Sequence, residues 1–463
     1  EQAPSPAPAA ASSSPTAAGA PDSIASTWLQ AARWWTAVSD YPAALRALDR
    51  GLATAGTLAE RLELQASRVV VLLNSQRVDE ATEHALSLAD ALQTEGSALP
   101  ADRLAAALFA CTAVAPYSPQ PQRLASLCDA VRARCEAGPP RARLSYHLAV
   151  GTCMNWLGQP LRADVDLAHA RRLADGFGDH GSVVNVTHQQ LRGALLRGDA
   201  HGALAAAQDC GKAVQAGGYG LSFRLHAWAA QALAALAAGQ PAAALSALQA
   251  LQAELAGVDL RSEPEVAAAR ALAWCALGRP ELAARDLPGC EGWLAFAHWR
   301  LAATASAREA ALAAMARLWP AADGVMGFRR RVLAMSLALP RAADAEALVA
   351  ELRARGLWPL ARQAHGIAAR SALAAGDGER AAAHAREALA LAEHVDPWTD
   401  EGAAVWPEAA AVLRAVGEAA EAAAAWEQGR AWVVRLAEEL PDEADRSAWR
   451  DRHPLHQALL VDG

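Results

Sequence analysis

The 463-residue sequence has few aromatic residues, almost no lysine and no long apolar run. Aromatic residues make up 5% of the chain, Lys212 is the only lysine, and the net charge is −8. Proteins that bind nucleic acid normally carry a basic stripe, so this charge balance argues against direct nucleic-acid binding by this chain. No stretch of about 18 apolar residues occurs, so we expect no membrane span.

Cysteines are too few and too irregular to form a framework. There are seven, an odd number, and no Cys-x-x-Cys pair is present. A disulfide scaffold or a structural zinc site is therefore not expected. We expect a reducing, cytoplasmic location, in which most of these cysteines act as small apolar side chains on helices.

Catalytic motifs are also missing. The segment Cys210-Gly211-Lys212 lacks the upstream glycine and the following hydroxyl residue of a phosphate-binding loop. Neither a His-Glu-x-x-His zinc helix nor a Gly-x-Ser-x-Gly elbow occurs. We therefore expect no enzyme activity, no cofactor and no metal. His147 and His365 are interpreted as half-buried histidines on helix-packing faces.

The abundant residue is alanine, which dominates a hydrophobic fraction of 53%. Alanine is the best helix former and occupies little volume, so the composition favours many closely packed helices. A recurring pattern supports this prediction. An apolar-periodic segment ends at a turn glycine, a short polar or proline turn follows, and an alanine stands five residues after the glycine. The six clear copies are Gly158 with Ala163, Gly198 with Ala203, Gly239 with Ala244, Gly278 with Ala283, Gly376 with Ala381, and Gly417 with Ala422.

The pattern predicts stacked helical hairpins. Glycine accepts the left-handed conformation that ends a helix, and the small alanine lets the two helices approach closely. Ser39 with Ala44 and Gln76 with Ala81 are variants without the glycine, and divergent units are expected near residues 116–121, Ser306 and Pro340. The spacing gives about eleven hairpins at a period of about 40 residues.

Large side chains strengthen the pattern and suggest a family. Trp28, Trp228 and Trp406 stand eleven residues before their turn marks, and Gly151 fills a small-residue position of its unit. Tryptophan, turn glycine and alanine at this spacing resemble the tetratricopeptide repeat. The resemblance covers roughly residues 24–440 and implies an all-α, right-handed superhelical solenoid of antiparallel hairpins. Two features depart from the usual repeat: the period exceeds 34 residues, and the usual proline near the repeat end is missing.

The long period is similar to repeats in the C-terminal halves of bacterial signal-transduction ATPases and transcriptional activators. Residues 432–460 also resemble the tail that closes such regulators, with Asp442 and Glu443 at one helix start and Pro454 at another. We therefore expect residues 23–440 to form the repeat domain and residues 441–463 to form capping helices. Residues 1–22, rich in Pro, Ala and Ser, are expected to be a disordered linker. Because residue 1 is Glu, we expect a processed chain or a fragment.

The resemblance implies a concave groove, lined by the first helix of each hairpin, that binds a protein or peptide. Polar residues on those helices are the candidate partner-binding residues, together with two residues of the Arg329-Arg330-Arg331 triplet. The triplet is interpreted as a solvated helix start or as a docking point for an acidic partner. The full candidate set is Asn155, Gln189, Arg192, Arg224, His226, Arg270, Arg329 and Arg330.

The leading hypothesis is a protein-interaction scaffold or sensor module, the C-terminal part of a bacterial signalling or transcription regulator. One alternative is an α/α-toroid enzyme that acts on carbohydrate, which would need a closed ring and an inward carboxylate pair about 5–10 Å apart. The other is an exported assembly scaffold, left after a signal is removed. The sequence does not specify the partner, the effector or the oligomeric state.

Overall fold

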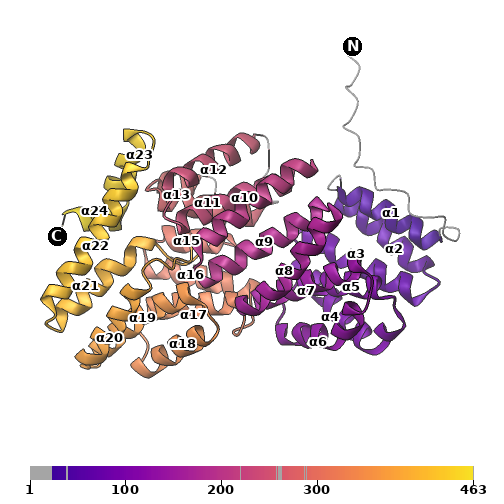
Figure 1. Ribbon diagram of the computed structural model, residues 1–463, viewed down its shortest axis with the longest axis horizontal. Coiled ribbons are helices and arrows are strands. Elements are labelled where there is room, and N and C mark those ends of the chain that lie inside the picture. Colours follow the sequence, from indigo (N-terminus) through magenta and orange to yellow (C-terminus); the bar gives the residue numbers. More distant parts are fainter. Residues whose placement is uncertain are drawn as a thin grey trace, which may run out of the picture.

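The computed structural model describes residues 23–461 except 38, 39, 219, 220, 257, 259–262, 286 and 288. All regular structure in this part of the chain is helical, and none of it is strand. The expected linker at residues 1–22 and the variant turn mark Ser39 lie outside the described residues. Helices follow one another from α1 at one end of the molecule to α24 near the other (Figure 1).

The described helices α1–α22 form eleven consecutive pairs, which confirms the predicted all-α class and its repeated helical hairpins. The first helices of the pairs are α1 (Ile24–Ala37), α3 (Leu58–Asn74), α5 (Ala101–Ala113), α7 (Pro140–Trp156), α9 (His180–Arg197), α11 (Leu221–Ala237), α13 (Pro264–Ala276), α15 (Leu294–Leu301), α17 (Val325–Leu337), α19 (Trp358–Ala374) and α21 (Val405–Ala415).

The second helices are α2 (Tyr41–Thr54), α4 (Val78–Glu95), α6 (Pro121–Glu136), α8 (Pro160–Phe177), α10 (Ala200–Gly217), α12 (Pro241–Glu254), α14 (Pro280–Arg285), α16 (Ala305–Leu318), α18 (Ala342–Ala354), α20 (Gly378–Ala390) and α22 (Ala419–Glu438). Short 3-10 turns, η1 (Gly96–Ala98) and η3 (Gly402–Ala404), precede α5 and α21. The ninth pair is the loosest, because α18 packs mainly against α19 and contacts α17 through the Arg331–Glu351 ion pair.

The turn glycines and their alanines have the predicted roles. All six glycines have a positive φ, between 64° and 92°. At Gly158 the backbone N–H donates to the Asn155 carbonyl (3.0 Å) and the next N–H donates to the Met154 carbonyl (2.9 Å), which closes the helix end. The alanines five residues after the eight marks are at most 2% exposed, so each lies where two helices meet: Ala44, Ala81, Ala163, Ala203, Ala244, Ala283, Ala381 and Ala422.

Gln76 occupies one of these turns without being glycine. Its φ is +60°, and it is the one described residue other than glycine with a positive φ. The same two hydrogen bonds close its helix, from Gln76 N–H to the Leu73 carbonyl (3.0 Å) and from Arg77 N–H to the Leu72 carbonyl (2.9 Å). The backbone therefore requires a conformation that costs a non-glycine residue about 1–2 kcal/mol.

Replacing Gln76 by glycine is expected to raise the free energy of unfolding by about 0.5–1 kcal/mol. The substitution relieves backbone strain in the folded state, and this gain exceeds the loss that comes from the larger conformational entropy of the unfolded chain. Gly376→Ala is the matched opposite change, because it places a side chain at a turn whose φ is +80°. An added Cβ there meets nothing within 4 Å, so only backbone strain is introduced. We expect it to lower the free energy of unfolding by about 1 kcal/mol. Urea unfolding followed by circular dichroism measures both, and a destabilised Gln76→Gly protein would contradict the shared turn geometry.

The chain coils tightly enough for its last units to contact its middle units. His394 Nδ1 lies 3.1 Å from the Gly198 carbonyl oxygen, and Arg355 Nη1 donates to the Leu157 carbonyl oxygen at 3.1 Å. Helix α19 also contacts α9, and α17 contacts α7. Parts of successive superhelical turns therefore lie against each other.

Aromatic residues on the inside of the coil contribute to this closure, because the Trp156 ring on α7 lies 6.3 Å from that of Trp293 on the later turn. The Trp293 ring centroid lies 4.9 Å from that of Trp398 and 5.0 Å from that of Trp319. Phe296 packs on both Trp319 and Trp398, at 5.6 Å. An open coil would expose these large apolar surfaces to water, so burying them favours the closed form.

Residues after α22 pack back on the repeats. They form α23 (Glu443–Ser447), η4 (Ala448–Arg452) and α24 (Pro454–Val461). The Asp442 carboxylate accepts the Asp445 N–H at 2.8 Å, and the Trp449 indole N–H donates to the Val433 carbonyl at 3.1 Å. Helix α24 contacts α22, and Leu459 is fully buried. The last hairpin therefore has its outer face partly covered. Among the described helices, none combines the length and hydropathy that a bilayer span requires.

Candidate functional site

All eight candidate residues lie on first helices of their hairpins. The structure places Asn155 on α7, Gln189 and Arg192 on α9, Arg224 and His226 on α11, Arg270 on α13, and Arg329 and Arg330 on α17. The inner side of the coil is therefore built from the helices that the sequence predicted. What the structure adds is which of these residues meet.

Four of the eight line one cavity of about 50 Å³, called here the first cavity: Asn155, Arg192, His226 and Arg329. Helices α7, α9, α11 and α13 form one wall, and α17 with Trp293 and Trp398 forms the other. The two walls come from successive turns of the superhelix. The cavity has room for a small polar group, such as the end of one side chain, and is too narrow for a helix.

The remaining four candidates do not line this cavity. Gln189 contributes its backbone carbonyl, which accepts the Asn155 amide at 2.8 Å. Arg224 forms an ion pair with Glu254 of α12 at 3.2 Å, and Arg330 donates to the Trp319 carbonyl at 2.7 Å. Arg270 lies half-buried on α13. Four of the predicted residues therefore line the first cavity, and the other four lie outside it.

One ion pair organises the floor of the first cavity. The Arg192 guanidinium contacts the Glu265 carboxylate at 2.6 Å and stacks over the Trp156 ring, 4.5 Å from its centroid. Burial acts to raise the pKa of the Glu265 carboxyl, but the charge of Arg192 and its hydrogen bond act against burial, and the pKa lies below its usual value. Glu265 is therefore held ionised by Arg192.

His188 borders the same pair without adding charge. Desolvation, with the positive charge of Arg192, lowers the pKa of His188 to about 3, so this imidazole is neutral at physiological pH. Asn155 is 1% exposed, and its side-chain oxygen has no hydrogen-bond partner among the described residues. The first cavity therefore combines a matched ion pair, a neutral imidazole and an unused amide acceptor.

The interpretation of the arginine triplet as a solvated helix start is wrong. Arg329 is 5% exposed, lies within α17, and donates twice to Asp396, from Nε at 2.8 Å and from Nη2 at 2.9 Å. Arg330 is half-buried, and Arg331 pairs with Glu351 at 2.9 Å. The triplet spreads around the helix, so each arginine meets a different neighbour, and the basic run forms no single patch.

Sequence reasoning missed the acidic and aromatic parts of the cavity. Glu265, Trp156, Trp293 and Trp398 all line it. Glu265 stands in the first turn of α13, a position where an acidic residue is ordinary. Trp293 and Trp398 precede α15 and follow α20, in irregular segments outside the repeat pattern. Of these four residues, only Trp156 could have been found from the sequence, because it is adjacent to the candidate Asn155 on α7.

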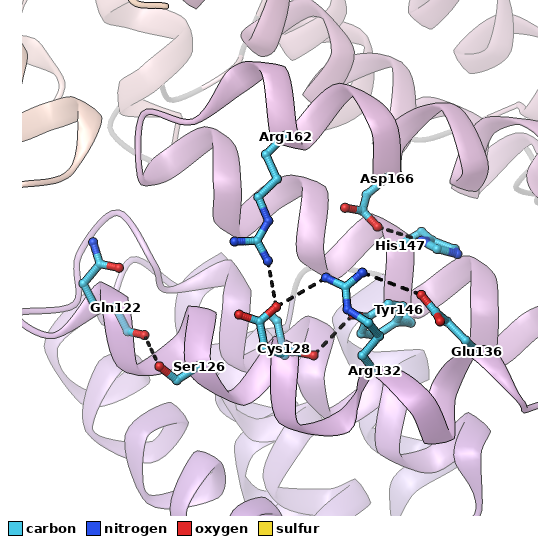
Figure 2. Close-up of polar contacts among 10 residues, drawn as sticks. Gln122, Ser126, Cys128, Arg132, Glu136, Tyr146, His147, Arg162 and Asp166 are labelled. Carbon is cyan, nitrogen blue, oxygen red and sulfur yellow. Dashed lines mark hydrogen bonds and ion pairs between the residues drawn. The ribbon is translucent and has the colours of Figure 1, made fainter. Parts of the chain in front are cut away.

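His147 has a partner that explains its burial. Its Nδ1 lies 2.8 Å from Asp166 Oδ1, so α7 and α8 are linked across the hairpin (Figure 2). The nearby Tyr146 hydroxyl donates to the Cys128 carbonyl at 3.3 Å. His365 is likewise buried, at 2% exposure. Both histidines lie in helix packing as predicted, but both are buried instead of half-buried. No group of three or more candidate metal ligands occurs among the described residues.

No protein-family model matches the chain, and no curated protein matches its sequence. A solved structure similar to it is the crystal structure of the APC/C hetero-tetramer Cut9-Hcn1, at 13% sequence identity and a TM-score of 0.34. The alignment covers 94% of this chain and 96% of that chain. A similarity at this level supplies no inference about what the present chain binds or does.

Proposed function

We propose that this chain is a non-enzymatic helical-repeat module that binds a protein or peptide partner, or senses a signal, through the inner surface of its superhelix. The observation that carries the proposal is the convergence of Asn155, Arg192, His226 and Arg329 on the inner side of the coil, around a cavity that admits the end of one partner side chain. The ion pairs of Arg192 and Arg329 and the hydrogen bond of Asn155 hold these side chains in place before a partner arrives. A preorganised surface loses little entropy on binding.

The proposal extends to the kind of protein that contains this module. The repeat pattern and the tail at residues 432–460 resemble the C-terminal regions of bacterial signalling and transcription regulators. On that resemblance, residues 23–440 are the repeat domain, residues 441–463 its cap, and residues 1–22, by composition alone, a linker to another domain. Arg224 and Arg270 then belong to the part of the inner surface that a partner reaches.

A carbohydrate enzyme of the toroid kind is less well supported. Such an enzyme needs two carboxyl groups facing each other across the site. Among the described residues that line the first cavity, Glu265 is the only carboxylate, and Arg192 occupies it. The Arg192–Glu265 ion pair in the first cavity therefore favours binding of a partner over acid–base catalysis.

Site-specific photo-crosslinking in cells tests the proposal. Benzoylphenylalanine is placed at Arg224 and Arg270 on the inner helices, and at the exposed Glu83 and Arg172 on second helices as matched controls. We expect the two inner positions to give the same discrete adduct and the two outer positions to give none. Adducts from the outer positions alone, the absence of adducts at every position, or substrate turnover by the purified chain would each overturn the proposal.

A further inference from the structure

A second cavity, of about 320 Å³, lies on the inner side of the last four hairpins. Its walls come mainly from the first helices α15, α17, α19 and α21, with the segment at residues 399–401 and Leu455 of α24 closing it. None of the eight residues singled out from the sequence lines it. Its volume reaches the lower end of the range typical of small-molecule sites, roughly 300–1,000 Å³.

The charges around this second cavity do not cancel. Its lining holds four arginines and three carboxylates. Three ion pairs use all of the carboxylates: Arg300 with Glu401 at 3.1 Å, Arg370 with Glu408 at 3.3 Å, and Arg362 with Asp400.

The fourth arginine, Arg308, is exposed and stacks over the Trp299 ring, 5.6 Å from its centroid. It has no carboxylate partner among the described residues. The lining therefore carries one uncompensated positive charge.

Two of the paired arginines also have an unused donor. Arg362 is 2% exposed, and its Nη1 donates to the Ala392 carbonyl at 3.2 Å, yet its buried Nε has no hydrogen-bond partner. The buried Nε of Arg370 lacks one as well. A buried N–H without an acceptor costs about 1–3 kcal/mol, and more when the group is charged. Neither Nε atom has accessible surface toward the cavity, so the uncompensated charge of Arg308 is the main attraction for an anion.

Apart from Ser336, Gln363 and Thr399, the rest of the lining is apolar. Trp299, Ile367 and Val405 lie on three different first helices, and Leu333 and Val412 extend the same surface. An occupant that uses the whole cavity must therefore offer an acceptor-rich anionic end and an apolar body. A fully polar anion would leave this apolar surface without contacts.

We propose that the second cavity binds an organic monocarboxylate of metabolite size. The carboxylate lies among Arg308, Arg362 and Arg370 and neutralises the surplus charge of Arg308. The apolar body packs on Trp299, Ile367 and Val405. The site goes beyond the proposed function, because it lies on other hairpins and stands whether or not a protein binds near the first cavity.

Calorimetric titration of the full chain tests this assignment. Octanoate is the probe, and octan-1-ol, acetate and inorganic phosphate separate the contributions of charge, apolar body and acceptor oxygens. We expect saturable binding of one octanoate per chain, with each of the other three at least tenfold weaker. Equal binding of octan-1-ol would overturn the role of the arginines. Tighter binding of phosphate would overturn the choice of a carboxylate with an apolar body.

Substitutions locate the site. Arg308→Met and Arg370→Met are each expected to weaken octanoate binding at least tenfold, and Arg341→Met, an exposed arginine paired with Asp344 outside the cavity, is the matched control. Because Arg308 is exposed, its variant keeps the fold and decides the question. Unchanged affinity in Arg308→Met, or an equal loss in Arg341→Met, would overturn the proposal. Crosslinking at Arg224 and Arg270 reports separately on the proposed function.

Discussion

Replacing Asp396 by alanine is expected to lower the free energy of unfolding by about 3–5 kcal/mol, because it leaves a buried guanidinium without its counter-charge. Arg329 and Asp396 are 5% and 3% exposed and make two parallel hydrogen bonds. Thr399 Oγ1 also donates to Asp396 Oδ2 at 2.9 Å, so the carboxylate holds the segment after α20 against α17. Losing it should loosen the packing of that segment on α17.

The double variant separates the missing partner from the loss of packing. Arg329→Met added to Asp396→Ala removes the unpaired charge, and we expect it to recover a large part of the loss. The control is Asp344→Ala, which breaks the exposed Arg341–Asp344 pair and should cost less than about 1 kcal/mol. Urea unfolding followed by tryptophan fluorescence measures all three proteins. If Asp396→Ala unfolded within about 0.5 kcal/mol of the wild type, the buried pair would not stabilise the packing of the segment after α20 on α17.

The hairpins could be predicted because their signals are local. A helix that ends in the left-handed conformation favours glycine at one position, and two helices in close contact favour a small residue five positions later. Gly239 and Ala244 illustrate both requirements within six residues of chain, with φ of +64° and complete burial. Each unit repeats the same two requirements, so even the units that lack the glycine, such as that of Gln76, could be placed.

The site could be predicted only in part because its second wall is remote in sequence. Arg355 meets Leu157 across 198 residues, and His394 meets Gly198 across 196. No local pattern marks such contacts, since they depend on how many hairpins complete one turn of the coil. For the same reason the arginine triplet was mistaken for a solvated run. Its local charge density is high, but each arginine has a partner elsewhere in the fold.

The free energy of unfolding is expected to fall steeply as pH is lowered from 6.5 to 5. His365, His453 and His456 are at most 4% exposed, and desolvation is the main cause that lowers their pKa, to about 4 for His365 and about 3 for His453. In the unfolded chain a histidine has a pKa of about 6.5. Below that pH the unfolded state binds protons at these imidazoles and the native state does not. The free energy of unfolding present at neutral pH is therefore lost on acidification.

Each such histidine removes up to about 1.4 kcal/mol of stability per pH unit, and about 1.6 kcal/mol between pH 6.5 and 5, because the unfolded-state imidazole is already half protonated at pH 6.5. The three together therefore account for about 5 kcal/mol, and His188 acts in the same direction. Urea unfolding at a series of pH values gives the slope, and His365→Gln, which keeps a polar group but does not titrate, should reduce it by about one proton. A slope below one proton in the wild type would mean that these imidazoles accept protons in the folded state, and that the inner packing is open to water.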